Sequence, residues 1–373
     1  VSEDVIWAAG THYVVNDSLY IAFQDSICIV TVSTDGGVTW SSHQAPMGNP
    51  AFVANLTAID GQTAWLSGLD AGGGGSKILK TSDGGATWAE QTSANWDAAA
   101  SWVDFTYFWS PAKGISMGDP TQGEFEIYTT ANGGDFWFRT DGSKIPDPLP
   151  GGEFGFNGGY DVVGNTVWFS TSFGRVYRSK NAGFDWEAFE TGLPAAYSVS
   201  FRDENTGFAS FTDFVNFTSQ VKITHDGGET WSDIASLPEG GNVRIEYGLA
   251  DVPGTNALVV GTSAGSLING SFKTWLTYDD GVTWTQIDEG HHIAWPEFIS
   301  PEVGWAGQSA KNSGPSYLFE FTSGVLGLLD PKPLDAEVSL FPNPTAGMFL
   351  LNVHSPQTTD FLLRRATTIF GWL

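Results

Sequence analysis

Four carboxylates and the aromatic side chains among them are the residues of this sequence best suited to chemistry. The acids are Asp97, Asp104, Asp119 and Glu124, and the aromatics are Trp96, Trp102, Tyr107 and Trp109. Aromatic rings beside carboxylates suit sugar binding, because the rings stack on a pyranose while the acids accept its hydroxyl protons. Paired carboxylates can also hydrolyse a glycosidic bond, one as acid and the other as base or nucleophile. The acids are therefore candidate catalytic residues, with turn capping or a solvated surface as the alternative, and the aromatics are candidate ligand-binding residues.

A second group of candidates follows later in the chain. The further candidate ligand-binding residues are Arg244, Glu246, His292, Trp295 and Glu297. Adjacent histidines on an extended segment point to opposite sides, so that only one of His291 and His292 could face a given metal ion. We therefore predict no metal site and no cofactor.

The charge and composition of the chain exclude several classes of function. The sequence has 42 acidic and 16 basic side chains, a formal net charge of −26, and no basic cluster, which argues against nucleic-acid binding. No apolar run approaches the length of about 18 residues that a membrane-spanning helix needs. The single cysteine, Cys28, lies in an alternating strand pattern and is expected to be a packed structural thiol. The 46 glycines, 16 tryptophans and 26 phenylalanines indicate many short strands joined by tight turns.

Six copies of one eight-residue turn define the frame in which these residues must lie. The copies begin at Ser33, Thr81, Thr130, Ser179, Thr224 and Thr277. A unit of about fifty residues is therefore repeated along the chain. Alternating strand patterns flank each turn, and upstream lies another strand pair joined by a tight polar turn, as in 200–211. Four strands per unit are the blade of a β-propeller.

The chemistry of each turn is local. The Asp or Asn at the third position can accept hydrogen bonds from the backbone of its own turn, and the Gly at the fifth position supplies a positive φ. The Trp at the eighth position is expected to pack between neighbouring sheets. These residues are assigned a structural role: Asp35, Asp83, Asn132, Asn181, Asp226 and Asp279, with Trp40, Trp88, Trp137, Trp186, Trp231 and Trp284.

The turn pattern Ser/Thr-x-Asp-x-Gly-x-Thr-Trp resembles the Asp-box, or BNR repeat. This repeat occurs in sialidases, xyloglucanases, sortilin-type receptors and photosystem II assembly-factor-like propellers. The resemblance covers residues 1–323 and implies a propeller, but enzymes and binding proteins share the box. Sialidases require three arginines and a Tyr/Glu pair, and an Arg-Ile-Pro motif usually precedes their first box. The chain has few arginines and lacks that motif, so sialidase activity is disfavoured. If the chain is an enzyme, the resemblance implies a glycoside hydrolase of the Asp-box propeller type.

The number of blades exceeds the number of turns. After the sixth turn comes a further series of three strand patterns, at 293–298, 304–307 and 317–321, with no eight-residue turn. We therefore predict an all-β fold, a seven-bladed β-propeller of four-stranded antiparallel blades, followed by a short C-terminal β segment. The segment 1–10 aligns with 299–307, so the first strands of the propeller are predicted to lie upstream of Val1.

The end of the chain departs from the repeat. Residues 324–336 form a predicted linker with two prolines, and Pro342-Asn343-Pro344-Thr-Ala-Gly347 follows in 337–373. This motif resembles the start of the C-terminal sorting domain of the Bacteroidetes type IX (Por) secretion system. The resemblance implies a secreted or outer-surface protein that engages the secretion machinery through this segment. Beyond His354 the family pattern fades, so 337–373 is expected to be a partial or aberrant sorting segment.

Three functions remain open at this stage. The first is binding of a polysaccharide or an extracellular protein on the face opposite the eight-residue turns. The second is a glycoside hydrolase or lyase, and the third is a non-catalytic assembly or structural factor. A close carboxylate pair in an open groove favours the enzyme, an aromatic platform favours a glycan, and an apolar patch favours a protein partner. We expect a monomer.

Overall fold

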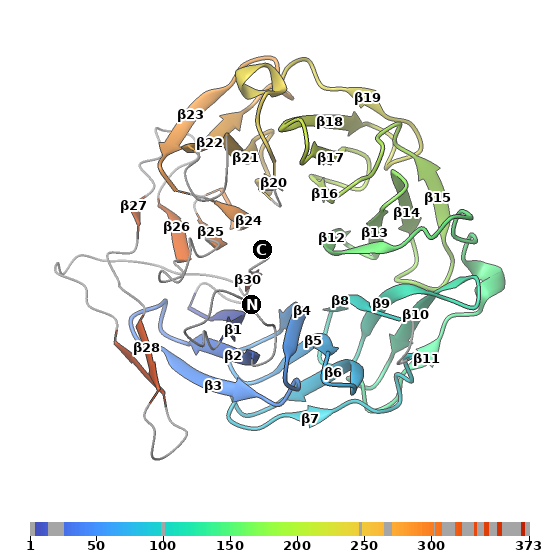
Figure 1. The fold of residues 1–373 in the computed structure, drawn as a ribbon, viewed down its shortest axis with the longest axis vertical. Helices are drawn as coiled ribbons and strands as arrows, with labels where there is room; N and C mark the ends of the chain where they lie inside the picture. Colours follow the sequence, from blue (N-terminus) through green and yellow to red (C-terminus); the bar gives the residue numbers. More distant parts are fainter. Residues whose placement is uncertain are drawn as a thin grey trace. The chain divides into compact units, whose positions relative to one another are not determined.

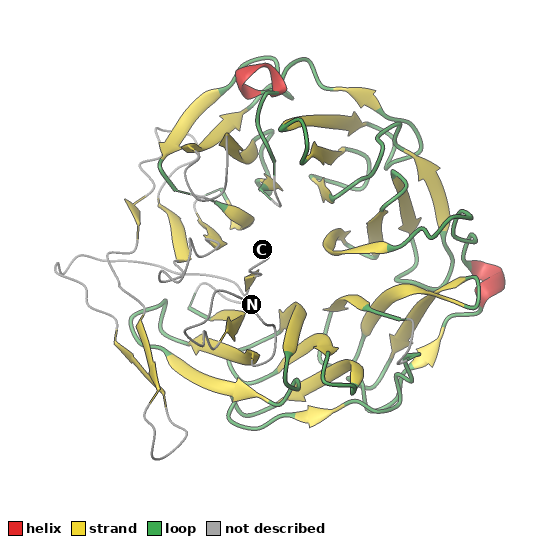
Figure 2. Cartoon of the chain, in the orientation of Figure 1, coloured by secondary structure: helices red, strands yellow, loops and turns green. Residues whose placement is uncertain are grey.

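The computed structural model describes residues 4–13, 26–97, 101–245, 248–264, 271–291, 293–301, 303–307, 318–322, 332–333, 339–342, 349–352 and 367–369. These residues belong to two compact units, Val1–Gly142 with Val338–Leu373, and Ser143–Glu337. Strands dominate both units, as Figure 2 shows. The helical elements among the described residues are two short 3-10 turns, η1 (Gly142–Lys144) and η2 (Pro238–Gly241).

The first unit contains three four-stranded sheets and one hairpin (Figure 1). The sheets are β30-β1-β2-β3, β4-β5-β6-β7 and β8-β9-β10-β11, and the hairpin is β28-β29. The strands are β1 (Ile6–Tyr13), β2 (Ser26–Ser33), β3 (Ser41–Ala45), β4 (Ala51–Ala58), β5 (Ala64–Asp70), β6 (Gly75–Thr81), β7 (Ala89–Glu90), β8 (Val103–Phe108), β9 (Gly114–Thr121), β10 (Glu124–Thr130), β11 (Phe138–Arg139), β28 (Ser339–Pro342), β29 (Phe349–Asn352) and β30 (Thr367–Ile369).

The second unit contains four four-stranded sheets, each in chain order. The strands are β12 (Gly155–Val163), β13 (Thr166–Thr171), β14 (Arg175–Ser179), β15 (Glu187–Glu190), β16 (Ser198–Phe201), β17 (Gly207–Asp213), β18 (Thr218–Thr224), β19 (Ser232–Asp233), β20 (Leu249–Asp251), β21 (Leu258–Ala264), β22 (Ser271–Thr277), β23 (Thr285–Glu289), β24 (Ala294–Ser300), β25 (Val303–Gly307), β26 (Leu318–Thr322) and β27 (Lys332–Pro333). Seven four-stranded sheets make the fold the seven-bladed β-propeller that the repeat predicts.

The sheet of β1 departs from the common pattern. In the other six sheets consecutive strands pair antiparallel, whereas β1 pairs antiparallel with β2 and parallel with β30. The expectation that strands upstream of Val1 belong here stays a prediction. In the last sheet, β27 lies within the segment 324–336 that the sequence assigns to a linker, and the rest of that segment lies outside the described residues.

Neighbouring sheets are joined through buried aromatic residues. Trp65 stacks on Phe108 of the next sheet, with ring centroids 3.5 Å apart and planes at 9°. In the second unit Trp168 stacks on Phe201 in the same way, at 3.8 Å. A side chain at Gly114 would meet the Phe108 ring at 2.5 Å, so only glycine fits beside it. Stacked pairs of this kind add about 0.5–1.5 kcal/mol each beyond the burial of their area.

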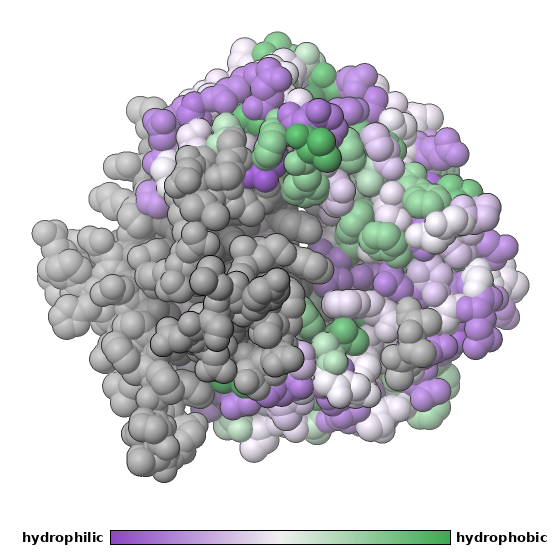
Figure 3. Space-filling view, viewed as in Figure 1, coloured by the Kyte–Doolittle hydropathy of each residue, from purple (hydrophilic) through white to green (hydrophobic). Residues whose placement is uncertain are grey.

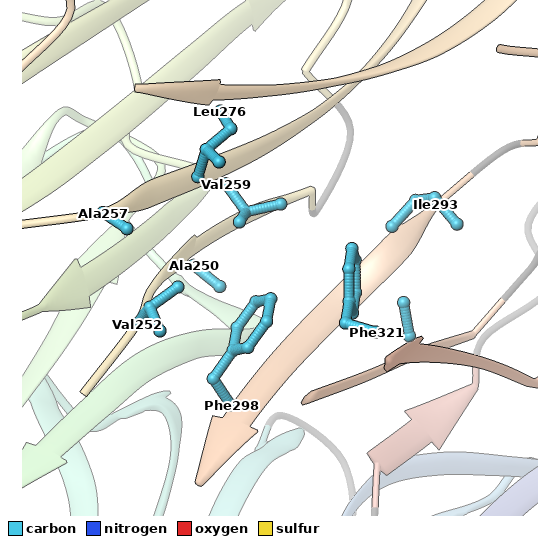
Figure 4. Close-up of a cluster of buried hydrophobic side chains, with 9 residues drawn as sticks. Ala250, Val252, Ala257, Val259, Leu276, Ile293, Phe298 and Phe321 are labelled. Carbon is cyan, nitrogen blue, oxygen red and sulfur yellow. The ribbon is translucent and has the colours of Figure 1, made fainter. Parts of the chain in front are cut away.

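Aliphatic and aromatic clusters fill the remaining space between sheets. Figure 4 shows one such cluster, in which Phe298 and Phe321 pack with Val259 and Leu276 of the preceding sheet. The rings of Phe298 and Phe321 lie 4.8 Å apart. Cys28 is buried in β2, as the alternating pattern predicts, and burial raises the pKa of its thiol above the usual value. The core thus consists of contacts repeated from sheet to sheet.

Candidate functional site

Each of the six sheets made of four consecutive strands has two ends that differ in chemistry, and in the sheet of β1 the turn from β2 to β3 corresponds to the turn from the third strand to the fourth. At one end, here called the turn end, lie the turns that join its first strand to its second and its third to its fourth. At the other, the loop end, lie the turn from the second strand to the third and the connection into the next sheet. The six eight-residue turns join third and fourth strands and therefore lie at the turn ends.

The polar groups of the eight-residue turns bond to one another. Asp83 accepts hydrogen bonds from the Thr87 hydroxyl at 2.5 Å, the Thr87 backbone N–H at 2.9 Å and the Thr81 hydroxyl at 2.8 Å. These bonds, the Thr87 hydroxyl first, lower the pKa of Asp83 to about 2. Gly85 has φ +86°, and the Trp88 indole donates to its carbonyl at 3.0 Å. The turns of Asp35 and Asp226 repeat these contacts.

Three turns vary this pattern. In the third turn Phe136 stands where threonine stands elsewhere, and its backbone N–H still donates to Asn132 at 3.0 Å. In the fourth, the Asn181 amide donates to the Asp185 carboxylate at 2.7 Å. In the sixth, the Trp284 indole donates to the Ser236 carbonyl at 3.1 Å. The third-position side chains of these turns therefore bond within their own turns, whereas the Trp284 indole bonds outside its turn. Trp137 and Trp186 are also buried.

Two consecutive β-bulges bring the candidate acids Asp104 and Asp119 together at a loop end. The pairing of β8 with β9 skips Asp104, and the pairing of β9 with β10 skips Asp119. A bulged residue leaves the in–out alternation of its strand. Asp104 is only 2% exposed, and its Oδ2 has no hydrogen-bond partner among the described residues. Burial, and then the charge of Asp119, raise the pKa of Asp104 well above its usual value.

The other two candidate acids lie at the same loop end, beside polar neighbours. The backbone N–H of Asp97 donates to the Glu126 carboxylate at 3.0 Å, and Glu126 is buried and pairs with Arg139 at 3.2 Å. Glu124 begins β10 and its carboxylate packs against Gly142. Residues 98–100 of the intervening loop lie outside the described residues.

The four candidate aromatics of this region are divided between the two ends of their sheet. Trp96 is buried against Tyr128, at 4.9 Å, and Trp102 tilts against Phe52 at 5.8 Å, both at the loop end. Tyr107 and Trp109 contact each other at 5.2 Å beside the tight turn that closes at Lys113, at the turn end. Strand β8 separates the pairs, because its six residues span about 20 Å. The single aromatic and acidic surface expected from the sequence is therefore not formed by these residues.

The later candidates have separate surroundings. Arg244 is buried, and its guanidinium lies over the ring of Phe217 at 4.9 Å. Trp295 is half-buried with φ +47°, and its indole lies close to Gly158. Glu297 is half-buried in β24. Glu246 and His292 lie outside the described residues.

An aromatic surface that the sequence analysis missed lies at the loop ends of two neighbouring sheets in the second unit. We call it the aromatic strip, and it consists of Phe154, Phe156, Phe173, Tyr197, Phe211 and Phe214. Phe156 contacts Phe154 at 5.4 Å and Tyr197 at 4.7 Å, and Tyr197 in turn contacts Phe214 at 5.5 Å. Phe154, Phe173 and Phe214 are 44%, 39% and 45% exposed. Phe173 lies next to this series of ring contacts, because its neighbour Ser172 bonds to the backbone of Phe154. Rings that contact one another over two sheets, yet face solvent, are typical of a binding surface.

A buried ion pair supports the strip from below. Glu153 precedes Phe154, and its carboxylate accepts two bonds from the Arg175 guanidinium. Thr171 and the Leu149 backbone N–H, at 2.7 Å, also donate to Glu153, and Arg175 donates to the Asp147 carbonyl at 2.9 Å. Burial alone would raise the pKa of Glu153, but the bonds from Arg175 and Thr171 lower it below its usual value. The loop that carries Phe154 is thereby fixed to β13 and β14.

The polar groups beside the strip bond within the protein. Asp213 accepts the backbone N–H groups of Val215 and Asn216 at 2.8 and 2.9 Å and holds the turn that presents Phe214. The Ser172 hydroxyl accepts the backbone N–H of Phe154 at 3.0 Å. The strip therefore offers ring faces more than hydrogen-bonding groups. The sequence did carry a signal for it, because Phe173 and Phe214 occupy turns where polar residues are usual.

Hydrophobic residues form separate areas on the face of the molecule that Figure 3 draws. In Figure 3, hydrophobic residues (green) gather in separate areas between hydrophilic ones (purple) over the described residues in view. Within the described ranges, no three His, Cys, Asp or Glu side chains gather closely enough to hold a metal ion. No helix in the described part of the chain has the length and apolarity needed to cross a bilayer.

Comparison with known proteins supports the fold. No family model matches the sequence, and no curated protein matches it. The structure is similar to that of YCF48 bound to a D1 peptide, with TM-score 0.54, 15% identity, and coverage of 87% of this chain and 93% of that one. It is also similar to YCF48 from Cyanidioschyzon merolae, with TM-score 0.53, 17% identity, and coverage of 80% and 90%. A third similar structure is that of U3-55K, with TM-score 0.51, 9% identity, and coverage of 76% and 85%.

Proposed function

We propose that this propeller binds a protein ligand, and that the aromatic strip receives an apolar segment of that ligand. The observation that carries the proposal is the continuity of the strip, in which partly exposed rings from two sheets contact one another. An exposed apolar surface on a folded domain is favourable to cover, at roughly 25 cal/mol per Å² removed from water. Aromatic residues also dominate the centres of protein interfaces.

The chemistry of the strip favours a protein segment over a sugar. Sugar sites combine rings with polar groups placed to bond hydroxyls. Here five of the six rings are phenylalanines, and the carboxylates directly before Phe154 and Phe214, those of Glu153 and Asp213, bond to their own surroundings. The structurally similar YCF48 was solved with a D1 peptide, which is compatible with peptide binding on such a fold.

The test is a selection of short random peptides on the immobilised protein, followed by titration of synthetic winners by fluorescence anisotropy. The double variant Phe154→Ser/Phe214→Ser should weaken binding at least about tenfold, because the loss of each ring should cost about 1 kcal/mol or more of binding free energy. Phe184→Ser is the matched control, because Phe184 is 57% exposed at the turn end of the same sheet as Phe154. Equal affinity of the wild type and the double variant would contradict the proposal, as would a selection that enriches no peptide.

A second candidate function is glycoside hydrolysis by Asp104 and Asp119. Its support is the pair of bulges that brings these acids together and the raised pKa of Asp104, a property of a catalytic acid. Burial of Asp104 weighs against it, since an acid catalyst must reach its substrate. The test is a polysaccharide panel scored for retention and for released reducing ends, with Asp104→Asn and Asp119→Asn as variants and Asp97→Asn beside them. Binding without product on every polysaccharide excludes this candidate.

We also propose that the six turns are Asp-boxes and that 337–373 derives from a type IX sorting domain, which implies a secreted or outer-surface protein. The repeated bonds of the turns and the motif from Pro342 to Gly347 support this. The motif residues 343–347 lie outside the described residues. The test is export from a type IX-secreting host with and without 337–373. Equal export of the two forms contradicts the sorting role.

A further inference from the structure

We infer that the segment received by the aromatic strip is basic, carrying lysine or arginine between its apolar residues. This inference rests on the proposed function and specifies its partner. It follows from the charges around the strip and from the ring faces, over which no lysine or arginine of the described residues lies.

The acids at the edge of the strip outnumber the available cations. Asp147 and Glu190 are exposed and lie beside Arg175, and both are at the loop end of the same sheet as Phe154. The charge of Arg175 is already balanced by Glu153, which is buried beneath the loop. Two exposed carboxylates therefore lie at the loop end of the sheet that carries Phe154, beside a cation that Glu153 already pairs.

At the other edge the carboxylate is better exposed than the cation. Asp213 lies close enough to Tyr197 for its charge to raise the pKa of that phenol, after the effect of burial. A cation of this region among the described residues is Arg244, which is only 6% exposed and lies over Phe217. A buried guanidinium is poorly placed to meet a ligand, whereas the carboxylate field extends into solvent over a Debye length of about 8 Å at physiological salt. The net charge of −26 adds to this field.

The ring faces themselves favour a cation. A lysine or arginine over an aromatic face gains about 0.5–2 kcal/mol. The protein uses this contact elsewhere, with Arg244 over Phe217 at 4.9 Å and Lys113 over Trp109 at 4.7 Å. Among the described residues, no lysine or arginine lies over the rings of Phe154, Phe173 or Phe214. An apolar and basic segment would cover these rings and meet the edge carboxylates together.

The test uses three synthetic peptides with the same alternating leucine and phenylalanine residues and with lysine, glutamine or glutamate between them. Fluorescence anisotropy at low salt should give the lysine peptide a dissociation constant about tenfold below that of the glutamine peptide, and the glutamate peptide the weakest binding. The preference should shrink as salt is added.

Three variants test whether the lysine preference arises at the strip. Asp147→Asn/Glu190→Gln should reduce the lysine preference about threefold, whereas Glu204→Gln, an exposed acid at a turn end, should leave it unchanged. Phe154→Ser/Phe214→Ser should weaken all peptides that bind.

The outcomes separate this inference from the function on which it rests. Equal affinity of the three peptides, or preference for glutamate, overturns the basic segment while apolar binding at the strip stands. Lysine-peptide binding that survives Phe154→Ser/Phe214→Ser overturns the inference as well, because charge alone would then attract the peptide. Failure of all three peptides to bind counts against the proposed function itself.

Discussion

The two ends of the sheet β12–β15 show the same fold used in opposite ways. At the turn end, Asn181, Asp185 and Ser179 bond to one another, and Phe184 stands exposed without a ring partner among the described residues. At the loop end, Glu153 and Arg175 are buried beneath the surface, and Phe154 and Phe173 stand above them. The polar groups at the turn end stabilise the turn itself, whereas those at the loop end fix the loop that carries an apolar surface. Exposure of a phenylalanine alone therefore does not identify a binding site.

The largest expected effect comes from breaking the buried pair under the strip. Glu153→Ala leaves the Arg175 guanidinium buried without its carboxylate, and should cost about 3–5 kcal/mol of unfolding free energy. Urea denaturation measures this loss. The double variant Glu153→Met/Arg175→Met is the control and should recover much of it, because no unpaired charge remains. A loss below about 1 kcal/mol in Glu153→Ala would show that the pair does not support the loop end.

A smaller effect is expected at the turn end. Asp226→Ala removes the acceptor of the Thr230 bonds and should cost about 1–2 kcal/mol, as for other side chains that bond a backbone N–H. Asp226→Asn should cost less, since Asn132 and Asn181 serve in two natural turns. Urea denaturation distinguishes the two, and equal losses would contradict the role given to the acceptor oxygen.

The pH dependence of this turn has a definite sign. Burial alone would raise the pKa of Asp226, but hydrogen bonds from Thr230 and Thr224 lower it to about 2 from the ordinary 3.8. Because the folded state holds the proton more weakly, the stabilisation is complete above about pH 4 and is lost as the pH falls toward 2. Asp226→Asn should therefore reduce the acid sensitivity of the melting temperature. The same fall of the melting temperature between pH 4 and pH 2 in Asp226→Asn as in the wild type would contradict this.

The loop-end carboxylate Asp104 should respond in the opposite direction. Its pKa is raised by burial and by Asp119, so the folded state holds the proton more tightly, and stability falls as the pH rises from about 4 through the folded pKa. Asp104→Asn removes this loss and should raise the melting temperature at pH 7 by roughly 2–4 °C, with less effect near pH 4. Asp135→Asn, an exposed acid of the same sheet, is the control. A lower melting temperature at pH 7 would count against the assignment.

The smallest effect on stability is expected from the exposed rings. Phe154→Ser and Phe184→Ser should each change the free energy of unfolding by no more than about 0.5 kcal/mol, as is usual at partly exposed positions. The two variants should then differ in peptide affinity and not in urea midpoint. A large loss of stability in Phe154→Ser would mean that the ring serves packing and not binding.

The sequence predicted the fold well because the fold is repetitive. The glycine and the third-position Asp or Asn of each turn bond within eight residues, so local sequence is enough to place them. The site was harder, because it depends on contacts between sheets. Phe156 and Tyr197 are far apart in the chain and meet only through the packing of β12 on β16.

The candidate acids illustrate a second difficulty. The alternation of side chains between the two faces of a strand does not predict the bulges, which remove Asp104 and Asp119 from that alternation. Nor could composition show that Trp102 and Trp109 lie at opposite ends of one strand, since both belong to one continuous aromatic run. Register, more than residue type, decides which side chains meet.

Hydrogen–deuterium exchange with and without a selected peptide tests the central claim most directly. Binding at the aromatic strip should slow exchange in 154–156, 172–174 and 211–217, and leave the turn 181–186 of the same sheet unchanged. Protection confined to 181–186 or to the other eight-residue turns, with the loop ends unaffected, would contradict the account.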